Sequence, residues 1–224
     1  MPSGDAIAQI VIGRTGEVPA TVGTSFEGCS FLMTPSRLFT IGHSTRSLEE
    51  FADLLATSEV TLLADIRRYP GSRRYPHFSR EALAVSLPQQ SIGYLHMAEL
   101  GGRRRPAPDS PNGGWRNDQF RAYADYMATD DFRLAVDRLL ALREPAVGES
   151  NVAVMCAEAV PWRCHRNLLS DELVRRGVDV VHIIGPGSTS RHVLNPMAMV
   201  CGDHLEYPPE QSALALLPHP DGGR

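Results

Sequence analysis

The stretch from Leu38 to Arg67 reads LFTIGHSTRSLEEFADLLATSEVTLLADIR and decides the fold class. It opens with a short β-branched and aromatic run that ends at a glycine, as a buried strand does when it passes into a loop. Ser47 then precedes two glutamates and apolar residues at helical spacing, so we predict a helix over residues 47–57. Val60 to Ala64 predicts a second buried strand. This order of strand, helix and strand indicates a parallel α/β unit.

The rest of the chain continues the alternation. Further strands are predicted at 92–96, 151–155 and 178–184, and further helices at 79–87, 120–127, 132–142 and 167–176. We therefore predict a single α/β domain, with a parallel or mostly parallel sheet of about five strands and helices on both faces. Residues 1–36 are expected to form an N-terminal extension, 37–200 the domain, and 201–224 a C-terminal tail.

Polar side chains directly follow three of the predicted strands. His43 and Ser44 follow the first strand, Asp65 and Arg67 follow the second, and the segment Cys156 to Arg166 follows the fourth. In open α/β sheets, ligands bind beyond the carboxyl ends of the strands. If these strands are neighbours in the sheet, the three groups share one site.

Arginine is distributed unevenly along the chain. All 22 basic residues are arginine, and the chain has no lysine. One predicted loop contains Arg67, Arg68, Arg73 and Arg74, and another contains Arg103 to Arg105. Arginine clusters suit bidentate recognition of phosphate or carboxylate, and solvated loop charge is the simpler alternative for any one cluster. A sequence pI of about 6.1 argues against a basic nucleic-acid-binding surface over the entire protein and is compatible with a local groove.

The segment MCAEAVPWRCHR, from Met155 to Arg166, concentrates the most reactive side chains. It lies between a predicted strand and a predicted helix, where a helix N-terminus favours anions and lowers the pKa of a thiol. Cys156 and Cys164 are therefore candidate nucleophiles, and for Cys156 a buried structural thiol is an equal alternative. A zinc site built from these thiols and His165 lacks a paired Cys-x-x-Cys motif, so we assign no metal.

His43, Asp65 and Glu158 are the candidates for acid–base chemistry. His43 directly follows a glycine at a strand end, which suits ligand contact or proton transfer. Asp65 is either a base with Arg67 as its electrostatic partner or one half of a salt bridge that fixes the loop. Glu158 has the same two interpretations with a nearby arginine of its own segment, Arg163 or Arg166.

The distribution of cysteines and of apolar residues indicates the cellular location of the protein. The four cysteines, Cys29, Cys156, Cys164 and Cys201, are widely spread in a chain without a secretory pattern, so the thiols are expected to be reduced. No apolar stretch approaches the ~18 residues of a membrane span, and the N-terminus lacks the features of a signal peptide. We expect a cytoplasmic protein without a membrane partner.

Several short motifs follow one another in a fixed order. They are FTIGHS at 39–44, LADIR at 63–67 with Pro70, Ser72, Arg73 and Phe78, then Tyr94, LGGR at 100–103, MCAE at 155–158 with Pro161, CHR at 164–166 and VHI at 181–183. In this order they resemble the uncharacterised bacterial and archaeal family called domain of unknown function 488. The resemblance implies an α/β domain with these motif residues at its site, and it brings no established reaction.

The main hypothesis is an enzyme that acts on a small anionic substrate, nucleotide-like or phosphate-bearing, in an arginine-lined pocket at the carboxyl ends of the strands. The candidate catalytic residues are His43, Asp65, Glu158 and Cys164, and the candidate substrate-binding residues are Ser44, Arg67, Arg73, Arg103, Cys156, His165 and Arg166. One alternative is a nucleic-acid-binding or regulatory module without turnover, which would use the same arginines and the aromatic residues Tyr69, Tyr75, Phe78 and Trp115. The other is a metal or redox site at Cys156 and Cys164. The sequence leaves the cofactor and the oligomeric state unknown.

Overall fold

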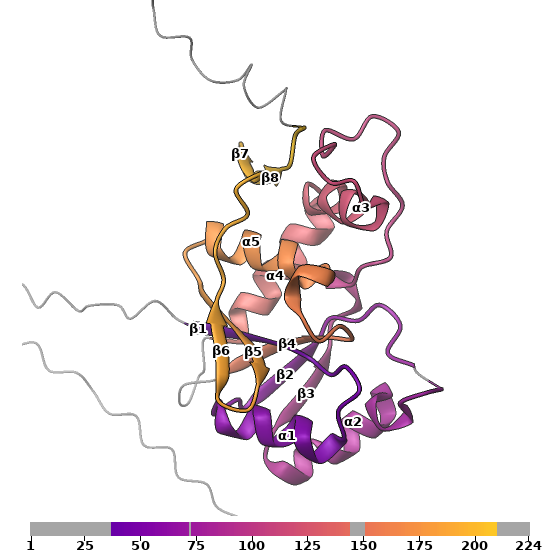
Figure 1. The fold of residues 1–224 in the computed structure, drawn as a ribbon, viewed down its shortest axis with the longest axis vertical. Helices are drawn as coiled ribbons and strands as arrows, with labels where there is room; N and C mark the ends of the chain where they lie inside the picture. Colours follow the sequence, from indigo (N-terminus) through magenta and orange to yellow (C-terminus); the bar gives the residue numbers. More distant parts are fainter. Residues whose placement is uncertain (1–36, 72, 144–150, 210–224) are drawn as a thin grey trace, which may run out of the picture. The chain divides into compact units, whose positions relative to one another are not determined.

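The structure is a computed structural model that describes residues 37–71, 73–143 and 151–209 (Figure 1). The N-terminal extension predicted at 1–36 and residues 210–224 of the predicted tail lie outside this part of the chain. Within the described ranges, no helix combines the length and the apolar character needed to cross a membrane.

A six-stranded sheet forms the centre of the domain. Its strands are β1 (Arg37–Gly42), β2 (Leu62–Asp65), β3 (Gly93–His96), β4 (Val152–Cys156), β5 (Asp179–Gly185) and β6 (Ser188–Arg191). They lie in the order β3-β2-β4-β1-β5-β6, and β1 to β5 are parallel. The predicted parallel sheet is confirmed. The antiparallel edge strand β6 was not predicted, because its four residues, STSR, are all exposed and have no hydrophobic pattern.

Helices cover both faces of the sheet, as predicted. The five α-helices of the described ranges are α1 (Leu48–Thr57), α2 (Arg80–Ser86), α3 (Asp118–Met127), α4 (Asp130–Ala141) and α5 (Arg166–Arg175). Successive strand residues point to opposite faces, so Phe39 packs with Phe51 of α1 in one core, whereas Leu38 packs with Phe132 of α4 in the other. Figure 1 shows α1 and α2 on one side of the sheet and α3, α4 and α5 on the other.

Side-chain caps explain where most of the helices begin. Ser47 Oγ accepts the N–H of Glu50 at 3.1 Å, and Glu50 Oε2 accepts the N–H of Ser47 at 2.8 Å, which completes a capping box at α1. Ser79, Asn117 and Thr129 cap α2, α3 and α4 with a side-chain oxygen. No side chain caps α5, which begins at the end of the polar segment after β4. Four short 3₁₀ helices complete the fold: η1 (Pro76–Phe78), η2 (Pro88–Gln90), η3 (Ala98–Leu100) and η4 (Pro161–Arg163).

The packed part of the chain extends past residue 200, beyond the predicted start of the tail. Strands β7 (Met199–Cys201) and β8 (His204–Glu206) form a hairpin. Directly after it, Tyr207 is fully buried, and its N–H donates to Asn112 Oδ1 at 2.8 Å while its hydroxyl donates to Asp171 Oδ2 at 2.9 Å. Strands of three residues are too short to give a periodicity signal, which is why the sequence did not reveal them.

Candidate functional site

The carboxyl ends of β1, β4 and β2 lie side by side, because β4 is between the other two strands in the sheet. Backbone hydrogen bonds continue past the strand ends: the N–H of His43 donates to Cys156 O at 3.0 Å, and the N–H of Ile66 donates to Met155 O at 3.0 Å. The three polar segments picked out in the sequence therefore occupy one place in the fold.

Two adjoining pockets of about 700 and 790 Å³ open at these strand ends. Because they share one wall, we treat them as a single arginine cleft; the shared wall consists of Arg67, Tyr69, Arg103, Ala157, Glu158 and Arg163. Arg68 and Arg104 also line the first pocket, and Arg74 also lines the second. Among the described residues, Glu158 is the only carboxylate in the lining of the cleft.

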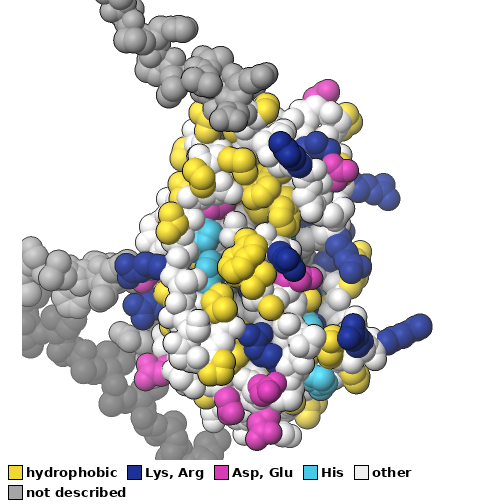
Figure 2. All heavy atoms as spheres, viewed as in Figure 1, with side chains coloured by type: hydrophobic (Ala, Val, Ile, Leu, Met, Phe, Trp, Pro, Cys, Tyr) yellow, Lys and Arg dark blue, Asp and Glu magenta, His cyan; other side chains and the backbone are white. Residues whose placement is uncertain are grey.

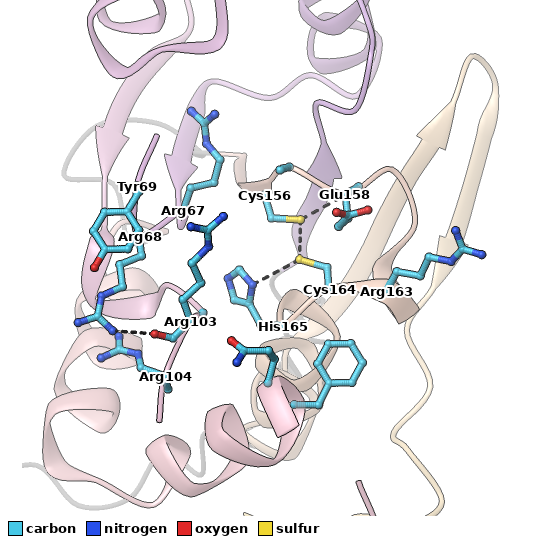
Figure 3. Close-up of a pocket in the computed structure, with 14 residues that line it drawn as sticks. Arg67, Arg68, Tyr69, Arg103, Arg104, Cys156, Glu158, Arg163, Cys164 and His165 are labelled. Atoms are coloured by element: carbon cyan, nitrogen blue, oxygen red, sulfur yellow. Dashed lines mark hydrogen bonds between the residues drawn. The ribbon is translucent and has the colours of Figure 1, made fainter. Parts of the chain in front are cut away.

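The close-up in Figure 3 shows how the first pocket is arranged. Arg103 reaches toward the middle, with Tyr69 on one side and the thiols of Cys156 and Cys164 on the other. The guanidinium of Arg163 points away from Arg103 in this view, toward the opposite side of the segment after β4. On the molecular surface, Figure 2 shows arginine side chains along the right-hand edge and acidic side chains gathered at the bottom, where α1 lies in Figure 1.

Arg67 is held rigidly by its neighbours. Its Nε and Nη2 donate to the two oxygens of Asp65 at 2.8 and 2.6 Å, and Nη2 also donates to Phe78 O at 2.8 Å. Nη1 donates to His43 Nε2 at 3.3 Å. Since a guanidinium has about five N–H donors, one N–H of Nη1 is left for a ligand in the cleft. This fixed geometry favours the prediction of Arg67 as a binding residue.

Asp65 has no oxygen free for proton transfer in this arrangement. It is fully buried, and besides both side-chain contacts from Arg67 it accepts the N–H of Arg67 at 3.0 Å and the hydroxyl of Tyr94 at 2.8 Å. Burial and the Asp65 charge raise the pKa of Tyr94, which keeps its hydroxyl protonated as a donor. Of the two interpretations of Asp65, the geometry favours the salt bridge that fixes the loop.

His43 is neutral at physiological pH and serves as an acceptor. Burial, followed by the charge of Arg67, lowers the pKa of His43 to about 4. Its Nδ1 lies 3.0 Å from Ser44 O, which requires the proton on Nδ1 and leaves Nε2 to accept from Arg67. The ring stacks on Phe78 with a centroid distance of 4.4 Å. His43 therefore orients Arg67 at the edge of the cleft.

Two residues at the cleft have left-handed backbone conformations. Ser44 has φ 51° and Arg103 has φ 59°, a region that costs a non-glycine residue about 1–2 kcal/mol. Ser44 lines the second pocket, and Arg103 lines both. Strained backbone of this kind gathers at functional sites, where the surrounding structure holds it in place.

Two predicted binding residues do not line the cleft. Arg73 is exposed and absent from both walls, and the neighbouring Arg74 takes its place in the second pocket. Arg166 is fully buried at the start of α5, so it lies outside the walls and cannot contact a ligand directly. The sequence places both arginines in the right segments, but side-chain direction in an irregular loop or at a helix start is set by tertiary packing.

Asp65, fully buried, also lines neither pocket, and the remaining predicted residues line the cleft. Cys156, Cys164 and His165 border the first pocket, where Cys164 Sγ lies 3.4 Å from His165 Nδ1. Burial, together with the nearby Arg166 and Arg104 charges, lowers the pKa of His165 to about 4. In the described ranges, no group of three or more His, Cys, Asp or Glu side chains is arranged to hold a metal ion.

Several cleft residues were not assigned to the predicted site, among them Arg68, Arg74, Arg104, Trp162 and Arg163. Arg104 is fixed by hydrogen bonds to Gly101 O and Glu99 O and lies 3.5 Å above the ring of Tyr126. Arg163 and Trp162 belong to η4, and their position between two cysteines of the polar segment was the available signal.

A family comparison now adds to this geometry. The model of the family described as "Domain of unknown function DUF488" matches residues 47–173. The chain belongs to this family. The matched range of this DUF488 protein contains Asp65, Arg67 and the whole segment from Cys156 to Arg166, whereas His43 and Ser44 precede it. No curated protein and no solved structure matches the chain.

Three buried histidines are expected to make the stability of the protein acid-sensitive. Burial is the main reason that the pKa values of His43 and His165 are lowered to about 4 and that of His182 to about 3. In the unfolded chain these histidines take up protons below pH ~6.5, whereas in the folded chain they do so only near pH 4 or below. Their contribution to the free energy of unfolding is therefore fully present above pH ~6.5 and is lost as the pH falls below that value. We expect a Tm roughly 5–10 °C lower at pH 5 than at pH 7.5.

Circular dichroism melts between pH 5 and 8 check this expectation. The variant His43→Gln removes one of the three groups and should show a shallower decline. The exposed substitution Arg105→Gln is the control and should leave the pH profile unchanged. A Tm that is constant over this range would contradict the lowered pKa values.

Proposed function

We propose that the chain is an enzyme that binds a small phosphate-bearing, nucleotide-like substrate in the arginine cleft. The charge of the cleft carries the proposal. Five arginines line the first pocket and Arg74 adds a sixth in the second, against the single carboxylate of Glu158. Within the described ranges, only one of the six, Arg67, forms a salt bridge. Guanidinium groups that face one cavity repel each other, and a polyanion that bridges them removes this repulsion.

The size of the cleft and its aromatic rim favour a nucleotide-like ligand. A pocket of about 700 Å³ lies within the range of small-molecule and cofactor sites. Tyr69 is 64% exposed at the rim, and the guanidinium carbons of Arg68 and Arg103 lie 5.8 and 6.0 Å from its ring centroid. An exposed ring next to two guanidinium groups offers a stacking surface for a base.

The side chains divide into binding, positioning and reacting roles. The free N–H of Arg67 Nη1 and the guanidinium of Arg103 bind the phosphate groups. His43 and Asp65 are positioning residues, because both form hydrogen bonds with the guanidinium of Arg67 and hold it at the cleft. Glu158 is the general acid–base candidate, since its carboxylate lies in the cleft lining and has no salt-bridge partner within the described ranges.

Isothermal titration calorimetry with ADP and with pyrophosphate tests the proposal. Arg103→Gln should weaken both ligands at least about tenfold, because hydrogen bonds between charged groups contribute about 1.5–3 kcal/mol. Arg105→Gln is the matched control, because Arg105 lies in the same loop, is exposed, and lines neither pocket. Tyr69→Ala should weaken ADP and leave pyrophosphate unchanged.

Two results would contradict the proposal. Equal affinities of the Arg103→Gln and Arg105→Gln variants would separate anion binding from the cleft. A single-stranded oligonucleotide that binds more tightly than ADP, with an affinity that falls steeply with added salt, would assign the cleft to nucleic acid instead.

A further inference from the structure

Two thiols are in direct contact at the floor of the arginine cleft. Cys156 ends β4 and Cys164 lies just before α5, eight positions along the chain, and their Sγ atoms are 2.7 Å apart. Both cysteines are free and buried, and both border the first pocket. This separation is shorter than an ordinary contact between two unbonded sulfur atoms, so the two thiols lie close to the arrangement of a disulfide.

A buried positive charge lies next to this pair. Arg166 is fully buried, and its Nη2 donates a hydrogen bond to Ala159 O at 2.8 Å. Its Nε and Nη1 have no hydrogen-bond partner among the described residues. A buried cation without a counter-charge costs several kcal/mol, so a negative group nearby is strongly favoured.

The thiol pair is the group that can supply this negative charge. Burial raises the pKa of Cys156, but the hydrogen bond from Cys164 and the charge of Arg166 outweigh it and lower the pKa overall. Burial and the adjacent Cys156 raise the pKa of Cys164. Glu158 opposes the effect on Cys156 only weakly, and His165 is neutral. Of the two thiols, Cys156 is therefore the one that ionises first, and Cys164 holds its proton more tightly.

We infer that Cys156 and Cys164 form a redox-active dithiol that hydrogen peroxide converts to a disulfide beneath the arginine cleft. The geometry of the two sulfurs and the unpaired guanidinium of Arg166 carry this inference, and it does not depend on which ligand the cleft binds.

The reaction proceeds in two balanced steps. The Cys156 thiolate attacks one peroxide oxygen, so that an S–O bond forms, the O–O bond breaks, and the leaving hydroxide takes up a proton to become water. The Cys164 sulfur then attacks the Cys156 sulfenic acid, an S–S bond forms, the S–O bond breaks, and the second oxygen leaves as water with the Cys164 proton. Two thiols and one hydrogen peroxide give one disulfide and two waters.

Access and geometry limit the oxidant and favour ring closure. Cys156 and Cys164 are 1% and 5% exposed but border the first pocket, so small reagents reach them through it and a small oxidant such as hydrogen peroxide is favoured. The sulfurs need to approach by less than 1 Å to reach the disulfide length of about 2.05 Å.

Oxidation changes the cleft itself. Glu158 and Arg163 lie in the segment between the two cysteines and line both pockets, so a disulfide ties the ends of a segment that forms the wall. It also removes the negative charge that offsets Arg166. Because the thiolate form is the one that Arg166 stabilises, we expect a disulfide that monothiols reduce readily.

Mass spectrometry of the full chain after treatment with hydrogen peroxide at pH 7 tests the inference. We expect a loss of two hydrogen atoms and a peptide that links Cys156 to Cys164. Cys201→Ser is the matched control and should oxidise like the unmodified chain. Cys164→Ser should stop at a sulfenic acid on Cys156 that dimedone traps. Arg166→Met should slow the oxidation at least about tenfold, because a thiol of ordinary pKa ~8.5 is only a few per cent thiolate at neutral pH.

The opposite results overturn the inference. They are an absence of the linked peptide, or a Cys156 that reacts no faster than Cys201. If Arg166→Met does not fold, Arg166→Lys keeps the charge and should retain fast oxidation. The rate at which iodoacetamide alkylates Cys156 in the unmodified chain, measured against pH, gives a second readout. A midpoint of this rate profile at or above pH ~8.5 would show that the pKa of Cys156 is not lowered.

Discussion

Replacing Arg67 with methionine is expected to lower the free energy of unfolding by about 3–5 kcal/mol, among the largest effects of any single substitution in this protein. The reason is that Asp65 is fully buried and receives both of its side-chain contacts with a cation from Arg67. Methionine keeps an unbranched but shorter side chain and leaves the carboxylate without a counter-charge. Urea denaturation followed by circular dichroism measures the loss.

A double-mutant cycle identifies the cause of this loss. The variant Arg67→Met with Asp65→Asn removes both charges and should lose clearly less stability than the sum of the two single changes. Arg68→Met is the control, since Arg68 is half-buried and its hydrogen bond goes to a backbone carbonyl, Arg103 O at 3.2 Å. Additive losses in the cycle would mean that the pair does not act as a unit.

The second large effect is expected from Gly42→Ala at the end of β1. A Cβ at this position would lie 1.7 Å from Glu158 O and 2.8 Å from Arg166 Nη1. Backbone cannot give way by that amount without moving the segment after β4 away from β1. We expect a loss of at least about 3 kcal/mol, or a protein that does not fold, and thermal unfolding measures it.

Gly185→Ala provides a matched control at the end of β5. No atom lies within 4 Å of a Cβ built there, so this variant should melt within a few degrees of the unmodified chain. Equal melting temperatures of the Gly42 and Gly185 variants would contradict the close packing of β1 against the segment after β4.

The fold could be predicted wherever local pattern and tertiary packing agree. The capping box at Ser47 and Glu50 and the apolar face of α1 gave that helix to within one residue. The exposed edge strand β6 and the hairpin of β7 and β8 could not be predicted, because their stability comes from pairing and from the burial of Tyr207. Such contacts join residues far apart in the sequence and leave no local signal.

The candidate site was predictable in its segments and less so in its roles. His43, Asp65 and Cys156 each lie at or just after the end of a strand, which is why the sequence grouped them. The structure places these three strands next to one another, in the order β2-β4-β1. The sequence could not show that both oxygens of Asp65 are occupied by hydrogen bonds from Arg67, or that Arg166 is fully buried. Those roles depend on where long side chains point, which packing decides.

The two proposals concern the walls and the floor of the arginine cleft. Arginines on the walls suit an anionic ligand, and a dithiol at the floor suits oxidation by a small peroxide. The segment with Glu158 and Arg163 belongs to both, so oxidation is expected to alter anion affinity. Comparison of pyrophosphate affinity for the reduced and oxidised chain would measure this coupling.

The central claim is that the strand ends of β1, β4 and β2 form an anion site. A crystal of the full chain soaked in tungstate, a phosphate-like anion, tests it most directly through anomalous diffraction. The expected result is an anomalous peak within hydrogen-bond distance of Arg67 Nη1 and the guanidinium of Arg103. Peaks only at other surface arginines, with the cleft empty, would contradict the claim.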